Sequence, residues 1–409
     1  MSEISIIAYG DGVCLNDHDR NPYGNEKYGL CAYCSGSNNW NKSNAVASQI
    51  KEWADWDKLE KVLESNPIIQ NAIKTGSIIT WNLWGANPDT PIPIAEGLDS
   101  PLERSQAILD FCEEFSKKHK INHQYFVSTN GFWLNDKRVQ DFYTKNPNMH
   151  LQLSYDGLGN YVRQGPFDPL WDKEIGPILV DFAKKGIFDL INITMTRQNN
   201  SMFANIALIN KWRFDNGLMD LEHFGVKNNH INDSPYCDHW NFKGKSLNTY
   251  INELERIFIM VKYGNIKNSP YWKPFSSYFE NQMVRWEPYN GDNGCGMYSI
   301  YANGQDPNDP IKHKTQDYNW SINTLGEYVV CQLIDKASDV PNPHLTRPAM
   351  CEKCEYGWLN ECHPCPDNIN NPNCQYKKEY ARLMLRMKLM NDIIPQNNNN
   401  NGKKCDCHN

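Results

Sequence analysis

The feature that most constrains this chain is a regular alternation of short apolar segments and amphipathic segments over its first 226 residues. Six short apolar runs are typical of buried strands: residues 4–9, 77–84, 123–128, 149–155, 190–196 and 221–226. Five stretches between them carry apolar residues three and four positions apart, which predicts helices: residues 53–64, 102–118, 138–144, 178–185 and 203–214. This alternation predicts an α/β fold, with a parallel sheet covered by helices and functional loops at the carboxyl ends of the strands.

The cysteines gather near the two ends of the chain. Of 14 cysteines, three lie before residue 35 and nine lie after residue 294. The first residues lack the basic start and long apolar run of a secretory signal, so we expect a cytoplasmic protein. Reducing cytosol disfavours structural disulfides, and the uneven distribution therefore predicts two separate metal or redox sites.

The remaining composition excludes some classes of function. Hydrophobic residues make up 40% of the chain, enough for a packed core. Apolar runs are too short to cross a bilayer, so we expect no membrane association. A net charge of −7 gives no electrostatic reason to expect nucleic-acid binding.

The first cysteine group is a triad that follows the first predicted strand, formed by Cys14, Cys31 and Cys34. Cys31 and Cys34 are three positions apart and can reach the same metal centre. Three thiolates on a four-iron cluster leave one iron open for a substrate or cofactor. The alternative is a zinc site completed by a histidine such as His18.

Three later strand ends carry loops rich in glycine and polar residues. They are the segments 84–88 (Trp-Gly-Ala-Asn-Pro), 128–131 (Ser-Thr-Asn-Gly) and 154–157 (Ser-Tyr-Asp-Gly), with Arg163 further along. Glycine lets the backbone approach a ligand closely at such turns. Each segment alone is an ordinary turn between a strand and a helix.

Together with the triad, these loops resemble those of the radical S-adenosylmethionine (SAM) superfamily. The resemblance implies a partial (β/α)6 barrel over roughly residues 1–230 and extends to much of 290–380. It implies that the triad holds a catalytic 4Fe-4S cluster, that Ser154 contacts the ribose or carboxylate of the cofactor and that Arg163 contacts the carboxylate. The cofactor-binding residues it implies are Tyr33, Gly85, Ala86, Asn87, Pro88, Ser128, Asn130, Ser154 and Arg163.

This chain departs from the usual pattern of the superfamily at two places. Sixteen residues separate Cys14 from Cys31, where three are usual, and the inserted segment is rich in turn formers and charge. Ala86 and Asn87 stand where a Gly-Glu pair is usual. Contacts from that loop are largely through the backbone, so we expect cofactor binding to be preserved.

The late cysteines form a second array with two C-x-x-C pairs, Cys351 with Cys354 and Cys362 with Cys365. Such an array indicates metal, either a structural zinc ribbon or a pair of four-iron clusters. The array resembles the SPASM extension of radical SAM enzymes that modify peptides and proteins. That resemblance assigns Cys295, Cys331 and Cys365 to one auxiliary cluster, and Cys351, Cys354, Cys362 and Cys374 to a second.

The other cysteines receive different interpretations. Cys112 shares a predicted helix face with apolar residues and is expected in the core. Cys237 follows the sixth strand at the expected barrel mouth, where a thiol could return a hydrogen atom to a product radical, although a structural role is the simpler interpretation. Cys405 and Cys407 lie on the tail and are given no role.

These observations divide the chain into a radical SAM barrel over residues 1–236, a helical bridge over 237–289, a SPASM-like domain over 290–392 and a disordered tail over 393–409. We expected residues 290–374 to be irregular and stabilised by metal, followed by a helix over 375–391.

The predicted activity follows from the resemblance. The enzyme would cleave SAM reductively to a 5′-deoxyadenosyl radical, which abstracts hydrogen from a peptide or protein in an oxidation, cross-linking or epimerisation. The expected partners are that substrate and a one-electron donor such as flavodoxin or ferredoxin. One alternative is a radical SAM dehydrogenase acting on a small alcohol or sugar. A different class of protein, a zinc-stabilised binding module without catalysis, also stays open.

Overall fold

The computed structural model describes residues 2–8, 52–84, 87–93, 96–157, 173–197, 199–221, 224–230, 244–263, 269–272, 320–329, 353–356 and 374–393. Within them, one eight-stranded sheet has the order β6-β5-β4-β3-β2-β1-β7-β8. All neighbouring strands are parallel except β7 and β8. The strands are β1 (Ser2–Ile7), β2 (Ile79–Trp84), β3 (His123–Thr129), β4 (Met149–Tyr155), β5 (Phe188–Met195), β6 (Gly225–His230), β7 (Trp320–Asn323) and β8 (Tyr328–Val329).

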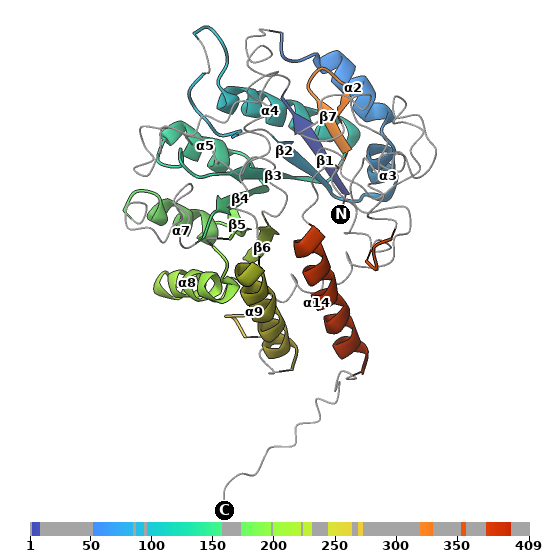
Figure 1. Ribbon diagram of the computed structural model, residues 1–409. Helices are drawn as coiled ribbons and strands as arrows, with labels where there is room; N and C mark the ends of the chain where they lie inside the picture. Colours follow the sequence, from blue (N-terminus) through green and yellow to red (C-terminus); the bar gives the residue numbers. More distant parts are fainter. Residues whose placement is uncertain are drawn as a thin grey trace, which may run out of the picture.

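Helices connect successive strands and lie along the sheet, as Figure 1 shows. They are α2 (Trp56–Ser65), α3 (Pro67–Thr75), α4 (Pro101–His119), α5 (Lys137–Lys145), α7 (Gly176–Lys184) and α8 (Met202–Asp215), followed by α9 (Gly244–Tyr263) and α14 (Cys374–Ile393). The parallel open sheet with its helices confirms the predicted α/β partial barrel.

Local capping sets where the helices begin. Ser100 and Glu103 form a reciprocal capping box at the start of α4, with Pro101 at its first position. Asn66 caps α3, where its side chain accepts from the amides of Ile68 and Ile69. The sequence analysis predicted one helix over 53–64 and no α3. Helix α2 instead begins after Asp55, whose side chain accepts from the amide of Lys58.

The structure contains two strands, β7 and β8, inside the segment that we expected to be irregular. Ile4 and Ile6 of β1 stand opposite Trp320 and Ile322 of β7. The pair is too short to produce a recognisable alternation in the sequence. The sixth strand was also placed too early, since β6 begins at Gly225.

The two faces of the sheet differ in chemistry. Successive side chains of a strand point to opposite faces, and the indole of Trp81 donates to Ser116 of α4, which identifies the helix-covered face. The residues that share this face with Trp81 are apolar and buried: Ile4, Ile79, Leu83, Tyr125, Val127, Leu151, Leu153, Ile191 and Ile193. The opposite, inner face is largely polar: Glu3, Ser5, Thr80, Asn82, Gln124, Ser128, Gln152, Ser154, Asn192, Thr194 and Asn323.

Helices α9 and α14 lie side by side at the end of the molecule away from β1 (Figure 1). The guanidinium of Arg386 on α14 binds the carboxylate of Glu255 on α9 at 2.8 Å. The hydroxyl of Tyr263 donates to the carbonyl of Met390 at 2.8 Å. The last described helix is therefore anchored on the helix that follows the barrel.

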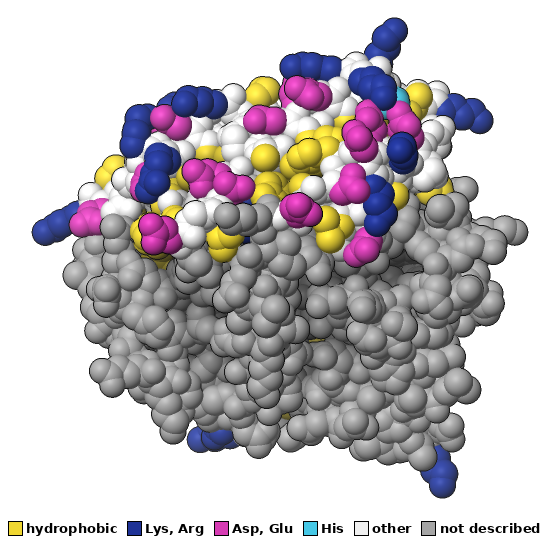
Figure 2. Space-filling view, turned by 90° about the horizontal axis from the view of Figure 1, so that it is seen from above, with side chains coloured by type: hydrophobic (Ala, Val, Ile, Leu, Met, Phe, Trp, Pro, Cys, Tyr) yellow, Lys and Arg dark blue, Asp and Glu magenta, His cyan; other side chains and the backbone are white. Residues whose placement is uncertain are grey.

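Acidic and basic side chains are intermixed on the described face that Figure 2 shows, with hydrophobic side chains between them. Ion pairs along single helices, such as Lys117 with Glu113 and Lys137 with Asp141, account for part of this mixing. Among the helices that the structure describes, none has the length and apolarity needed to cross a membrane.

Candidate functional site

The carboxyl ends of strands β2 to β5 meet at one edge of the sheet because these strands are parallel neighbours. Each strand is followed there by a buried polar turn. The turns contain Asn87–Thr90 after β2, Thr129–Phe132 after β3, Asp156–Gly157 after β4 and Thr196–Asn199 after β5. Residue 198, in the last of these turns, is not described. This edge contains three of the loops that the sequence analysis singled out.

The turns after β2 and β3 are joined by hydrogen bonds. The amide N–H of Asn130 donates to the Asn87 Oδ1 at 3.4 Å, and the Asn87 Nδ2 donates to the Thr90 hydroxyl at 2.7 Å. The Thr129 Oγ1 donates to the Asp89 Oδ2 at 2.5 Å and accepts from the Gly131 N–H at 2.9 Å. We call these residues, together with Tyr143, the β2–β3 network.

Asp89 is the centre of this network and is fully buried. Its Oδ2 also accepts from the hydroxyl of Tyr143 on α5 at 3.1 Å. Burial raises the pKa of Asp89 to about 6, against the opposing effect of the hydrogen bonds from Thr129 and Tyr143. The Asp89 Oδ1 has no hydrogen-bond partner in the part of the chain that is described.

A second set of contacts, the β4–β5 network, joins the turns after β4 and β5. The Asn199 Nδ2 donates to the carbonyl of Asp156 at 2.9 Å and to the carbonyl of Thr194 at 3.2 Å. The Asn199 Oδ1 accepts from Asn205 of α8 at 2.8 Å. Gly157 has φ of +77°, and a Cβ there would lie 1.8 Å from the Asn199 Nδ2. The turn therefore requires glycine for its conformation and for the space that Asn199 occupies.

Below these turns, the inner face of the sheet carries hydrogen-bonding groups that no other described residue uses. The side-chain oxygens of Asn82 on β2 and Asn192 on β5 are buried and, among the described residues, have no hydrogen-bond partner. Parallel sheets are usually apolar on both faces, and a buried unsatisfied oxygen costs about 1–3 kcal/mol. Both observations fit a polar ligand that carries N–H or O–H donors. SAM offers an amino group, ribose hydroxyls and an adenine amine.

Several predicted cofactor residues lie at this edge. Asn87 and Asn130 are buried, and each uses its side chain within the turns, since the Asn130 Oδ1 accepts from the Phe132 N–H at 3.0 Å. The Pro88 carbonyl accepts from Ser105 of α4. Ser128 faces the inner side and accepts from Gln152 at 2.9 Å. Ser154 stands beside Asn192 on the same inner face and is half-buried.

The remaining predicted site residues lie outside the described residues, with two exceptions. Cys354 is described and half-buried, and Cys374 begins α14. The others outside the described residues are Cys14, Cys31, Tyr33, Cys34, Gly85, Ala86, Arg163, Cys237, Cys295, Cys331, Cys351, Cys362 and Cys365. The cluster ligands therefore stay predictions. Cys112 is buried on α4, as expected.

Two residues at this edge, Asp89 and Asn199, were not identified from the sequence. Asp89 directly follows the Pro88 of a segment already singled out, so an acidic residue beside that motif was a usable signal. Asn199 lies in an ordinary polar turn after β5, and nothing in the sequence distinguishes it from Asn200.

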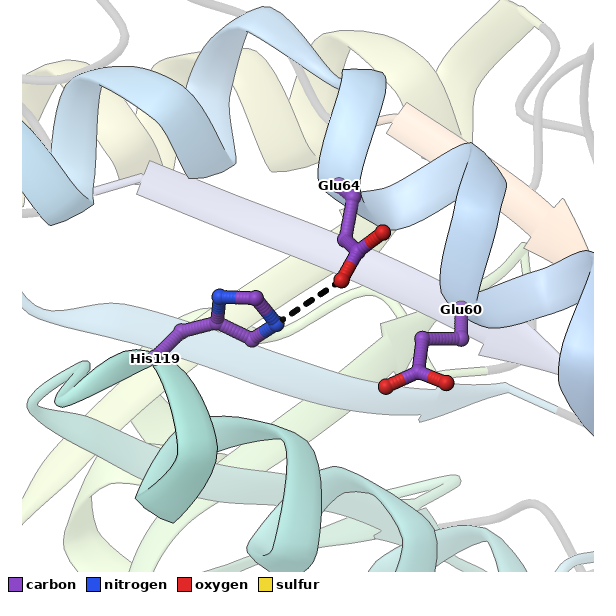
Figure 3. A group of neighbouring side chains, drawn as sticks. All are labelled: Glu60, Glu64 and His119. Carbon is purple, nitrogen blue, oxygen red and sulfur yellow. Dashed lines mark ion pairs between the residues drawn. The ribbon is translucent and has the colours of Figure 1, made fainter.

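A separate group of possible metal ligands lies on the outer surface, where Glu60 and Glu64 of α2 approach His119 of α4 (Figure 3). Their ligand atoms lie within 4.8 Å of one another. Lys118, however, already donates to Glu60 at 2.8 Å and to Glu64 at 3.2 Å. His119 ends α4 just before β3 begins, so the group lies away from the edge where the polar turns meet. We interpret it as a surface ion-pair network.

Solved structures with the same arrangement of elements include anSMEcpe, an anaerobic sulfatase-maturating enzyme of the radical SAM family with a SPASM domain. Native anSMEcpe with bound AdoMet and Cp18Cys peptide matches with a TM-score of 0.52 and 14% identity, over 96% of this chain and 99% of that chain. Native anSMEcpe with bound AdoMet matches with a TM-score of 0.51 and 15% identity, over 96% of this chain and 100% of that chain. The chain shares the fold of these solved structures.

The radical SAM fold thus confirms, at the level of fold, the resemblance that the sequence motifs indicated. No protein-family model matches the sequence, and no curated protein matches it. At 13–15% identity the radical SAM likeness concerns backbone architecture, so the chemistry has to be argued from this chain's own residues.

Proposed function

We propose that this chain is a radical SAM enzyme that modifies a peptide or protein by abstracting hydrogen from it. The observation that carries the proposal is the polar inner face, where the Asn82 and Asn192 oxygens are buried below the polar turns and have no partner among the described residues. A side chain that exists only to hold the fold together would not leave such groups unsatisfied.

In this proposal, Cys14, Cys31 and Cys34 hold the catalytic 4Fe-4S cluster, and Tyr33, Gly85, Ala86 and Arg163 contribute cofactor contacts. When bound, the cluster and SAM supply a radical able to abstract hydrogen from an unactivated C–H bond. Asn82, Asn192 and Ser154 offer acceptors to the cofactor's amino and hydroxyl groups. The helices on the opposite face of the sheet keep water from reaching the cofactor site from that side.

A peptide substrate is supported by the match to anSMEcpe, which was solved with AdoMet and a peptide bound, over nearly the whole of both chains. The match extends through the segment with the late cysteines, which we propose holds one or two auxiliary clusters. Reductive cleavage consumes one electron, so a one-electron donor such as flavodoxin or ferredoxin is a required partner. Cys237 stays a candidate hydrogen donor, and we propose a cytoplasmic location.

Anaerobic reconstitution tests the proposal. The reconstituted chain should bind iron and sulfide and release 5′-deoxyadenosine from SAM when reduced with dithionite. Cys31→Ala and Cys34→Ala should abolish that release, whereas Cys112→Ala, which changes a buried cysteine of α4, should leave it unchanged. Stoichiometric zinc with little iron, or undiminished release in the triad variants, would contradict the proposal.

A further inference from the structure

The β2–β3 network contains the buried carboxylate of Asp89, to which the resemblance to radical SAM enzymes assigns no role. It lies two residues beyond Asn87, in the same turn, and it reaches both the turn after β3 and helix α5. Among the described residues, the hydrogen bonds of its carboxylate are with Thr129 and Tyr143, neither of which is assigned to the cofactor.

The geometry around Thr129 indicates what this carboxylate does. Because Thr129 donates its hydroxyl hydrogen to Asp89, its oxygen lone pairs are available to the Gly131 N–H. Gly131 has φ of +78°, a left-handed conformation that the turn must maintain. The donor–acceptor distance of 2.5 Å is within the range of O–H···O⁻ hydrogen bonds, which are about twice as strong as neutral ones.

Protonation would change this arrangement. Both donors already point at the Asp89 Oδ2, so an added proton would go to Oδ1, which has no acceptor among the described residues. The bond from Thr129 would then lose its charge assistance. The turn after β3 would therefore be held less firmly when Asp89 is protonated.

Neighbouring charged groups do not take over this role. The charged side chains in the first turns of α4 and α5 include Glu103, Arg104 and Arg138. Glu103 binds the α4 cap, Arg104 lies over the Trp53 ring, and Arg138 binds Asp136. The titratable group that faces the carboxylate is Tyr143, which donates to it.

We propose that Asp89 is a positioning residue, whose ionised carboxylate holds the turn Thr129–Gly131 in the shape that binds SAM. This inference rests on the proposed function, because it assigns that turn to the cofactor. The raised pKa of Asp89, about 6, brings its change of charge close to neutral pH. The turn should therefore be ordered above pH 7 and loosen below pH 6.

The experiment uses the reconstituted full chain and compares Asp89→Asn with wild type. Hydrogen–deuterium exchange of peptides covering residues 126–134 is measured without SAM between pH 5.5 and 8 and divided by the intrinsic exchange rate at each pH to give protection factors. SAM affinity is measured by calorimetry at the same pH values. At pH 7.5 we expect the variant to exchange several-fold faster over these residues and to bind SAM about three- to tenfold more weakly. The protection factors of wild type over residues 126–134 should approach those of the variant as the pH falls below 6, and the variant's protection factors should not change with pH.

Two further variants separate positioning from general support of the fold. Thr129→Val removes the hydrogen bond from Thr129 to Asp89 but keeps the carboxylate. It should reproduce the faster exchange over residues 126–134. Tyr143→Phe removes the other donor and should leave the turn close to wild type. The unfolding temperature of Asp89→Asn at pH 7.5 should be unchanged or higher, because the variant removes a buried charge.

Three outcomes would overturn the inference. One is identical exchange over 126–134 in wild type and Asp89→Asn at pH 7.5. Another is a pH dependence that Asp89→Asn retains. The third is a loss of SAM affinity in Tyr143→Phe equal to that in Thr129→Val. The exchange experiment needs no bound SAM, so a failure of the proposed function, seen as no SAM binding in wild type, is distinguishable from a failure of this inference.

Discussion

The β2–β3 network and the β4–β5 network lie at the same edge of the sheet and both fix turns at strand ends, but their central groups differ. Asp89 is a carboxylate whose charge can change near neutral pH. Asn199 is an amide that cannot ionise, and it fits against Gly157 so closely that no side chain could be added there. One pair of turns is thus held by an adjustable charge and the other by steric fit and neutral hydrogen bonds.

The steric network should give the largest effect. Gly157→Ala would place a Cβ 1.8 Å from the Asn199 Nδ2 at a φ of +77°, so Asn199 would be displaced from its hydrogen bonds. Left-handed strain of roughly 1–2 kcal/mol and unsatisfied groups at about 1–3 kcal/mol together predict a loss of roughly 2–5 kcal/mol. For a chain of 409 residues, this loss corresponds to a fall of about 2–6 °C in the anaerobic unfolding temperature.

The control for this variant is Gly97→Ala. Gly97 has φ of +78°, and no described atom lies within 4 Å of an added Cβ, so Gly97→Ala tests the backbone strain without a clash. Adding Asn199→Ala to Gly157→Ala should cost less than the two single changes together, because it removes the clash. Equal losses in the two glycine variants would show that Asn199 is not the constraint.

The charged network should give an intermediate effect with a defined pH dependence. The pKa of Asp89 is raised from 3.8 to about 6, so the folded state binds the proton more tightly than the unfolded chain. Stability from this group is fully present below pH 4 and is lost as the pH rises through 6, by about 3 kcal/mol. The difference in unfolding temperature between Asp89→Asn and wild type should grow in favour of the variant from pH 4 to 7. A difference independent of pH would rule out this titration.

A titratable pair at the amino ends of β4 and β5 should give the smallest effect. The His150 Nδ1 lies 2.5 Å from the Asp189 Oδ2, and that hydrogen bond raises the pKa of His150. The pair therefore stabilises the fold below about pH 6.5, and this stability is lost as the pH rises through the raised pKa. Both side chains are partly exposed, so Asp189→Asn should cost less than about 1 kcal/mol at pH 5.5 and nothing at pH 9. Loss of the same size at both pH values would show that the ion pair is not the cause.

Repeating apolar patterns made the strands and helices of the barrel predictable. Elements without such a pattern could not be predicted. Strand β4 was predicted over the same residues that the structure gives, because both its faces follow a clear pattern. Strand β7 was missed because four residues carry no periodicity, and its pairing with β1 spans more than 300 positions. The turns containing Asn87, Asn130 and Gly157 were found because glycine and asparagine are rare inside strands and typical of turns.

The hydrogen-bond partners within the site could not be predicted. Asp89 and Thr129 are 40 positions apart, and only the parallel register of β2 and β3 brings them together. Nothing local in the sequence indicates that Asp89 is buried, since an acidic residue beside a proline is usually exposed in a turn. The inner polar face was visible as alternating polar residues, but which of its oxygens lack partners depends on the packed structure.

The position of β1 between β2 and β7 also has a consequence during synthesis. Strand β2 leaves the ribosome soon after β1, but residue 320 follows about 240 residues later, roughly 12–50 s at ordinary elongation rates. During that interval none of the described strands is available for the other edge of β1, and such edges invite association with other chains. Slower elongation between β6 and β7 would lengthen this exposure, so the yield of soluble protein should depend on how quickly that part of the message is translated.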